Sequence, residues 1–193
     1  MSKAQTDPTS PARVSRRTRF SLLLPVLLIA AFYGGKALLR GHVDGLIQAS
    51  VAKDLPAFAL ADASGASWSA ARLRGKPAVL HFFRSRCHSC DAEAEAYRRF
   101  EQSLADGRAL VLHICTDRVL DFPPELTAAT IAQKQFTQPV LMADGAFVDA
   151  FHSAKWSNVT PVTYVVDASS RIRFALRGAQ SFEQLTEALA AAQ

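Results

Sequence analysis

Two cysteines separated by two residues, Cys87 and Cys90, stand between a short apolar run and an amphipathic segment. The run before them, residues 78–83, reads Ala-Val-Leu-His-Phe-Phe and is typical of a buried β-strand. The segment after them, residues 91–105, repeats large apolar residues three and four positions apart and therefore predicts a helix. Cys87 should then lie at a strand-to-helix junction, at the helix N-terminus, with Cys90 one turn further in.

This position suits a cysteine that reacts as a thiolate. The free N–H groups of a first helical turn and the helix dipole stabilise negative charge on the Cys87 sulfur. Arg84, Arg86 and His88 are close in sequence and can add positive potential. Because Cys90 can close a disulfide with Cys87, one site can attack a substrate disulfide, form a mixed disulfide and resolve it.

Two other interpretations compete with redox chemistry: half of a zinc site, or two structural core residues. A structural zinc site needs about four ligands. The third cysteine, Cys115, stands alone in a predicted apolar strand at residues 109–116. We interpret it as a small core residue rather than as another redox thiol. The spacing of the other two cysteines favours a redox pair.

The positive charge of the chain is concentrated at its N-terminus. Seven of the 22 lysines and arginines, but one of the 17 acidic residues, lie in the first 40 positions, so this segment carries +6 and the rest −1. The near-neutral remainder lacks the basic surface with which proteins bind nucleic acid. We therefore expect no nucleic-acid partner.

A long apolar run follows the basic residues. Residues 20–39 are long enough to cross a bilayer if the Lys36 ammonium reaches the interface. The basic cluster before them predicts a cytoplasmic N-terminus. A cleaved signal peptide is the alternative, but no clear small-x-small cleavage site follows the apolar core. A twin-arginine signal is a weak match, because Arg19 stands where an apolar residue is usual.

These patterns predict four segments. Residues 1–19 form a disordered basic cytoplasmic tail, 20–39 a transmembrane signal anchor, 40–54 a linker, and 55–193 the folded domain. A single-pass protein of the inner membrane, with its C-terminal domain in the periplasm, follows from this order.

The folded part alternates strands with helices. Strands are expected at residues 58–60, around Trp68, and at 78–83, 109–116, 138–142, 163–166 and 172–176; helices are expected at 91–105, 125–135, 146–151 and after a capping box at Ser181–Gln184. The order β-α-β-α-β-α, followed by a hairpin and a closing helix, predicts an α/β fold with a mixed sheet.

From residue 55 to 192 the chain resembles the thioredoxin superfamily, and most closely its membrane-anchored TlpA/ResA-like thiol–disulfide oxidoreductases with a redoxin domain. The matching motifs are Leu55-Pro56-x-Phe58 with Gly65, Gly75-Lys76-Pro77, Cys87-x-x-Cys90 and Val159-Thr160-Pro161-Val162-Thr163. The resemblance implies a thioredoxin-like fold: a central mixed β-sheet flanked by helices, with an N-terminal β-hairpin extension and a single N-terminal transmembrane helix.

The resemblance also implies roles for individual residues. Cys87 would attack and Cys90 would resolve the mixed disulfide. Thr160 and Pro161, whose peptide bond is cis in the family, would shape the substrate groove. Neither an organic cofactor nor a metal is implied, because the cysteine pair carries two electrons.

Several positions depart from the family pattern. Arg86 replaces the usual tryptophan; it either lowers the pKa of the attacking cysteine, reads an acidic partner, or is simply solvated. His81 stands where thioredoxin carries a buried acid, so it either relays the proton of the resolving cysteine or is a neutral core residue. His88, next to Ser89 between the cysteines, would stabilise a thiolate and thereby raise the reduction potential.

The function predicted from these features is that of a protein-disulfide reductase. The resemblance implies disulfide-containing client proteins, a membrane electron-donor thiol protein, and service in cytochrome c maturation or a copper-stress pathway. We expect a monomer.

Three alternatives remain on the same fold. A dithiol oxidant is favoured by the positive charges of Arg86 and His88. A copper-binding metallochaperone would use both cysteines and a histidine such as His152, although copper-carrying relatives space their cysteines by three residues. A thiol peroxidase would need a threonine at the position of Arg84.

Overall fold

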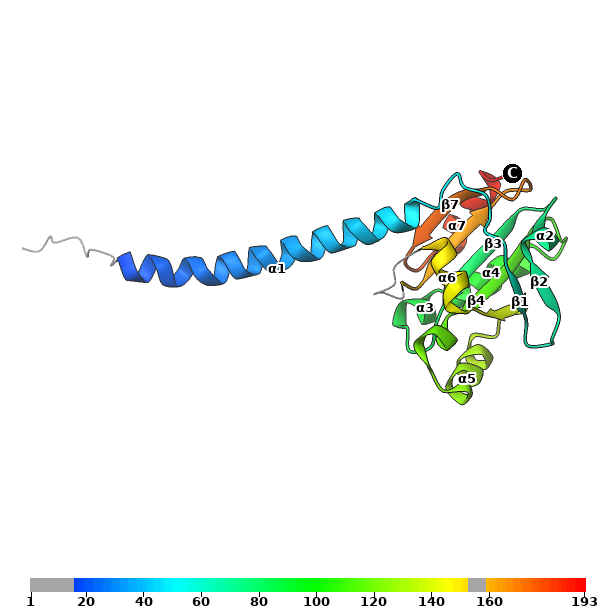
Figure 1. Cartoon of the computed structure of the whole chain (residues 1–193), viewed down its shortest axis with the longest axis horizontal. Coiled ribbons are helices and arrows are strands. Elements are labelled where there is room, and N and C mark those ends of the chain that lie inside the picture. The colour runs from blue at the N-terminus through cyan, green and yellow to red at the C-terminus, as the bar shows by residue number, and fades with distance from the viewer. Residues whose placement is uncertain (1–15, 153–158) are drawn as a thin grey trace, which may run out of the picture. The chain divides into compact units, whose positions relative to one another are not determined.

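A computed structural model describes residues 16–152 and 159–193, and the chain divides into two compact units, residues 1–42 and 43–193. Residues 16–42 of the first unit belong to helix α1 (Arg16–Gln48), drawn in blue to cyan in Figure 1. Of the tail expected over residues 1–19, the first 15 positions lie outside the described residues. Within α1, Leu24–Gln48 is long and apolar enough to cross a membrane, with a mean hydropathy of 1.3. Its length and composition equally fit a signal sequence.

Helix α1 runs further than the sequence indicates. We expected a linker over residues 40–54, but the helix continues to Gln48, and Val43 and Ile47 are buried in the core of the second unit. These two residues are four positions apart and therefore share one helix face. The Gln48 side chain donates to the Ala175 carbonyl at 2.7 Å. The sheet-containing unit thus begins before residue 55.

A five-stranded mixed sheet forms the centre of this unit, in the order β5-β4-β3-β6-β7. Its strands are β3 (Ala78–Phe83), β4 (Leu110–Cys115), β5 (Val140–Met142), β6 (Val162–Val166) and β7 (Ile172–Arg177). The three strands β3, β4 and β5 are parallel, whereas β6 is antiparallel to both of its neighbours. A separate hairpin pairs β1 (Ala59–Ala61) with β2 (Ser67–Ser69). The predicted mixed sheet and N-terminal hairpin are confirmed.

Helices cover both faces of the central sheet (Figure 1). They are α2 (Ala70–Leu73), α3 (His88–Ala92), α4 (Ala94–Ser103), the 3₁₀ helix η1 (Asp117–Leu120), α5 (Pro124–Lys134), α6 (Gly145–Phe151) and α7 (Phe182–Ala190). Alternate residues of β3 point to opposite faces. Leu80 and Phe82 pack in one apolar cluster with α6 and the hairpin, while Val79 packs in another with α4 and α7.

The helix expected over residues 91–105 differs from the prediction in one respect. It starts earlier, at His88, and is interrupted at Glu93, which ends α3 and precedes α4. The side chain of Glu93 is buried and hydrogen-bonded to His81 and to the backbone N–H of Gln180. This inward carboxylate accompanies the break between the two helices.

Candidate active site

The cysteine pair lies where β3 turns into α3. The chain leaves β3 at Phe83, and Arg86 adopts the left-handed conformation with φ of 53°. Cys87 is the N-cap of α3, and its sulfur accepts a hydrogen bond from the backbone N–H of Cys90 at 3.2 Å. The two residues form a disulfide, with a Cα–Cα distance of 5.2 Å. The first-turn N–H group thus faces the Cys87 sulfur, as thiolate stabilisation requires.

The loop before β6 lies against this sulfur. The Cys87 sulfur is 4.0 Å from both the carbonyl oxygen and the hydroxyl oxygen of Thr160. The Thr160–Pro161 peptide bond is cis. Arg84 donates from Nε to the Thr160 hydroxyl at 3.1 Å, which ties this loop to the end of β3. The structure therefore brings Thr160 and Pro161 beside the cysteine pair.

Three of the residues that we expected to tune the site face solvent. Arg86, His88 and Ser89 are all exposed around the Cys87 sulfur, which is itself largely covered. The Arg86 guanidinium lies 5.9 Å from the ring centroid of Phe122. Water and salt can therefore screen the charge of Arg86.

A buried carboxylate holds the loop that carries Arg86. Asp117 accepts hydrogen bonds from the Ser85 backbone N–H at 2.7 Å and from the Ser85 hydroxyl at 2.5 Å. The Thr127 hydroxyl of α5 donates to the same carboxylate at 2.7 Å. All three side chains are buried. Asp117 thereby joins the loop before Cys87 to η1 and α5.

The sequence matches a known protein family. The model of the AhpC/TSA family matches residues 51–175, which is more than half of the chain. The chain belongs to the AhpC/TSA family. The thiol–disulfide oxidoreductase YkuV of Bacillus subtilis is 26% identical over 111 residues, covering 57% of this chain and 72% of that protein.

Solved structures share the fold of this AhpC/TSA protein at low identity. A thioredoxin-family thiol:disulfide interchange protein from Chlorobium tepidum superposes with a TM-score of 0.63 at 20% identity, over 72% of this chain and 95% of that one. The thioredoxin domain of a thiol–disulfide oxidoreductase from Bacteroides vulgatus gives 0.59 at 19% identity, over 71% and 96%. These matches confirm the thioredoxin-like fold and, with the family, the expected oxidoreductase class.

A buried lysine, which we did not predict from the sequence, lies directly behind the cysteine pair of this family member. Lys134 at the end of α5 has a side chain that is 2% exposed. Its ammonium donates to the Cys90 carbonyl and to the Asp91 carboxylate, both at 2.8 Å. A buried ammonium costs free energy unless it is paired and hydrogen-bonded. These two bonds meet that requirement and place a positive charge beside α3.

His81 is the first member of a buried chain of four side chains. Its Nε2 is 2.8 Å from the Glu93 carboxylate and its Nδ1 is 2.9 Å from Nδ1 of His113. The Nε2 of His113 is 2.6 Å from the Glu101 carboxylate. All four residues are at most 2% exposed. We refer to Glu93, His81, His113 and Glu101 as the Glu–His–His–Glu chain.

The protein environment sets the charges in this chain. Burial lowers the pKa of His81 to about 3 and that of His113 to about 4, so both rings are neutral near pH 7. Burial raises the pKa of Glu93 to about 8. Although burial opposes it, hydrogen bonds from His113 and Thr137 lower the pKa of Glu101. The neutral, hydrogen-bonded state of His81 is one of the two alternatives that the sequence left open.

Two other sulfur or imidazole groups lie away from this arrangement. Burial raises the pKa of the Cys115 thiol to about 12, as for a small core residue. His152 packs against Phe82, on the face of the sheet opposite His81, and its Nδ1 is 3.0 Å from the Tyr164 hydroxyl. Within residues 16–152 and 159–193, no group of three or more His, Cys, Asp or Glu side chains is placed to hold a metal ion.

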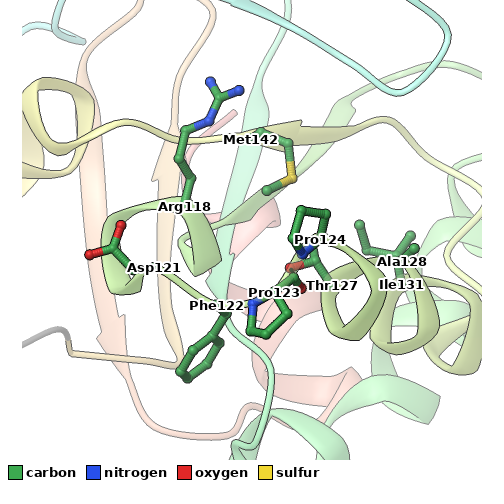
Figure 2. Close-up of a pocket in the computed structure, with 9 residues that line it drawn as sticks. All are labelled: Arg118, Asp121, Phe122, Pro123, Pro124, Thr127, Ala128, Ile131 and Met142. Carbon is green, nitrogen blue, oxygen red and sulfur yellow. Dashed lines mark hydrogen bonds between the residues drawn. The ribbon is translucent and has the colours of Figure 1, made fainter.

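An apolar pocket of about 570 Å³ adjoins the redox site. It is lined by Arg118, Asp121, Phe122, Pro123, Pro124, Thr127, Ala128, Ile131 and Met142. Figure 2 shows the Met142 side chain extending from β5 toward Pro124, while the Arg118 guanidinium points away. Ile131 and Met142 also pack against the apolar cluster that contains both disulfide cysteines. The pocket therefore offers an apolar surface next to the disulfide.

Proposed function

We propose that this protein is a membrane-anchored protein-disulfide reductase that acts outside the cytoplasm. The observation that carries the proposal is the Cys87–Cys90 disulfide at the N-terminus of α3, against the Thr160–Pro161 loop. Thiol–disulfide exchange follows from the family and the cysteine pair. The direction of electron flow, the membrane anchor and the compartment are our proposal.

In the proposed cycle the reduced Cys87 thiolate attacks one sulfur of a client disulfide. The second client sulfur leaves as a thiolate and takes up a proton, and Cys87 becomes disulfide-bonded to the client. The Cys90 thiol then loses its proton and attacks the Cys87 sulfur, which forms the Cys87–Cys90 disulfide and releases the first client sulfur, the one bonded to Cys87, as a thiolate that takes up a proton. Two electrons reach the client, and a donor dithiol must then reduce the enzyme.

The positive charges around the disulfide do not require the opposite, oxidising direction. Arg86 and His88 are exposed, so their charges are screened. Lys134 is already paired with Asp91. A strongly oxidising site would need positive charge that selectively stabilises the thiolate. We therefore retain the reductase that the sequence suggested.

For the copper-binding alternative, the described residues contain no group of three His, Cys, Asp or Glu side chains placed to hold a metal ion. The ring of His152, the expected partner, lies against Phe82 and Tyr164. Copper retained in equimolar amount after purification, together with no turnover of protein disulfides, would favour a metallochaperone over our proposal.

We predict that the full-length protein fractionates with membranes and exposes residues 43–193 outside the cytoplasm. The basis is the basic cluster ahead of the apolar part of α1. Protease added to spheroplasts should digest the domain, while a cytoplasmic marker protein stays intact. A domain that resists digestion until the cells are lysed would contradict the topology.

Replacing His88 with proline should make the disulfide harder to reduce. His88 is the first residue of α3, a position that tolerates proline, so the change removes the imidazole near Cys87 without breaking the helix. Because the imidazole is exposed, we expect the reduction potential to fall by about 30 mV or less, a tenfold change in the equilibrium constant. Equilibration with glutathione measures the shift, with Glu95→Gln, at an exposed position of α4, as the control. An unchanged potential would show that the His88 ring does not act on the sulfur.

A further inference from the structure

The Glu–His–His–Glu chain is built by the pairing of two strands and one helix stripe. His81 and His113 are direct neighbours in the parallel register of β3 and β4, so their rings leave the same face of the sheet. Glu93, Tyr97 and Glu101 are four residues apart and form one stripe along α4 and its start. Tyr97 stacks on His81 with ring centroids 3.9 Å apart. Phe136 stacks on His113 at 3.7 Å.

The hydrogen-bond distances fix the number of protons in the chain. Its four members are joined across three gaps of 2.8, 2.9 and 2.6 Å. Each neutral imidazole carries one N–H proton, and an ionised carboxylate carries none. If both carboxylates were ionised, two protons would have to serve three gaps, and one gap would hold two lone pairs that face each other. Each imidazole nitrogen either donates or accepts, so the three gaps need three protons. With both rings neutral, one of the two carboxyl groups must hold the third proton.

The surroundings decide which carboxyl group that is. The second oxygen of Glu101 accepts from the backbone N–H of Thr137 at 2.7 Å and from its hydroxyl at 2.5 Å. The second oxygen of Glu93 accepts from the backbone N–H of Gln180 at 3.1 Å. Shorter and more numerous donors favour the ionised form. The negative charge therefore belongs on Glu101.

We propose that Glu101, acting through His113 and His81, keeps a proton on the carboxyl group of Glu93, one helical turn beyond Cys90. In this arrangement Glu93 donates to His81 Nε2, His81 Nδ1 donates to His113 Nδ1, and His113 Nε2 donates to Glu101. Glu101 is a positioning residue, because it acts on the redox site through the two imidazoles.

The other charged or titratable groups near the Glu–His–His–Glu chain do not change the positions of its three protons. Lys134 of α5 is paired with Asp91 and the Cys90 carbonyl. The Tyr97 hydroxyl of α4 is 2.6 Å from the Thr163 hydroxyl of β6, and burial raises its pKa well above the usual value, so it stays neutral. Cys115 of β4 likewise stays a thiol at pH 7. The positions of the three protons are thus set by the four side chains themselves and by the donors at the two ends, Thr137 and Gln180.

The consequence for catalysis rests on the proposed thiol–disulfide exchange. An ionised carboxylate at Glu93, the residue that ends α3 one turn after Cys90, would oppose thiolate formation, because like charges disfavour each other in a low-dielectric interior. A protonated Glu93 removes that opposition at neutral pH. Glu101, far along α4, would in this way help Cys87 and Cys90 to react as thiolates.

The substitution Glu101→Gln should reverse the whole chain. The introduced amide must turn its oxygen toward the Thr137 N–H, which can only donate, and its NH₂ group toward His113. His113 Nε2 then has to accept, His113 Nδ1 donates to His81, and His81 Nε2 donates to Glu93. Glu93 is therefore expected to become ionised, and its pKa to fall below the value of about 8 that it has in the wild type.

The substitution Glu93→Gln should leave the chain unchanged. Here the amide oxygen must face the N–H of Gln180, and the NH₂ group faces His81, just as the protonated carboxyl does. The two isosteric variants are thus expected to behave differently. Glu95→Gln, on the exposed side of α4, is the matched control.

Nitrogen NMR of ¹⁵N-histidine-labelled full-length protein in detergent reads the tautomers directly. In the oxidised wild type, Glu93→Gln and Glu95→Gln proteins, we expect His81 to carry its proton on Nδ1 and His113 on Nε2; in Glu101→Gln the two assignments should exchange. Carboxyl ¹³C shifts against pH give the Glu93 pKa. His81 protonated on Nε2 in the wild type, or a reversal in Glu93→Gln instead of Glu101→Gln, would overturn the proposal. The wild-type tautomers test the proposal even if a variant fails to fold. Because this measurement does not depend on turnover, it can fail or succeed independently of the proposed function.

Discussion

Replacing Cys87 with serine is expected to abolish disulfide exchange, whereas replacing Cys90 with serine is expected to trap mixed disulfides with client proteins. Cys87 caps α3, and its sulfur receives the first-turn N–H, while Cys90 is fully buried behind it. Without Cys87 no activated thiolate attacks the client. Without Cys90 the attack proceeds, but no thiol resolves the adduct.

Non-reducing electrophoresis of cell extracts distinguishes the two variants. Adducts should accumulate with Cys90→Ser and disappear on reduction, and Cys87→Ser should form none. Cys115→Ala is the control, since that thiol is buried in the sheet and outside the disulfide. Adducts formed by Cys87→Ser but not by Cys90→Ser would reverse the assignment of attacking and resolving residues.

The second large effect is a stability maximum between about pH 6.5 and 7. In the folded protein burial lowers the pKa of His81, His113 and His152 to about 3, 4 and 4. The unfolded chain binds more protons on these rings below its histidine pKa of about 6.5. Stability should therefore fall as the pH drops from 6.5 toward 4, by about 1.4 kcal/mol per pH unit for each proton taken up.

Above the pH of maximum stability, the stability falls as the pH rises, and Glu93 causes this fall. Burial raises its folded pKa to about 8 from the usual 4.5, so the folded protein holds a proton that the unfolded chain has lost. Stability should fall by up to about 1.4 kcal/mol per pH unit from pH 7 to 8 and then level off with respect to this group. Urea unfolding of the full-length protein in detergent, repeated across this range, measures both limbs.

The variant Glu93→Gln isolates the alkaline limb. Glutamine mimics the protonated carboxyl but cannot ionise, so the decline between pH 7 and 8 should disappear while the acid limb remains. Glu95→Gln, an exposed position on the same helix, should retain both limbs. A Glu93→Gln protein with an undiminished alkaline limb would show that another group causes it.

The sequence predicted the frame of the active site because its signals are local. The apolar run of β3, the cysteine spacing and the amphipathic pattern of α4 each depend on a few neighbouring residues. The capping box at Ser181–Gln184 is likewise present at the start of α7. The Thr160–Pro161 motif pointed to the loop beside Cys87 through the family resemblance, and the structure places it there.

The charged interior could not be predicted in the same way. Glutamate and lysine are almost never fully buried unless they are paired, so Glu93, Glu101 and Lys134 look like solvent-facing residues in the sequence. Their partners are distant: Glu101 meets His113 and Thr137, and Lys134 meets the backbone of Cys90. A usable signal was present, because the four-residue spacing of Glu93, Tyr97 and Glu101 includes the core-facing tyrosine.

The boundary of the folded unit was also missed for a physical reason. We expected residues 40–54 to be a linker between the apolar span and the folded domain, and Gly41 and Gly45 lie within it. The structure instead continues the helix, because Val43 and Ile47 bury their side chains in the core and Asp44 pairs with Arg177 at 2.6 Å. Tertiary contacts outweigh the low helix propensity of glycine here.

The reduction potential of the Cys87–Cys90 pair tests the proposed direction of the reaction most directly. Full-length protein in detergent is equilibrated with graded ratios of reduced and oxidised dithiothreitol, and the reduced fraction is read by thiol alkylation. A reductase should have a potential below about −200 mV, toward the value of about −270 mV for thioredoxin. A potential near −120 mV, the value of a strong dithiol oxidant, would contradict the reductase and assign the opposite direction of electron flow.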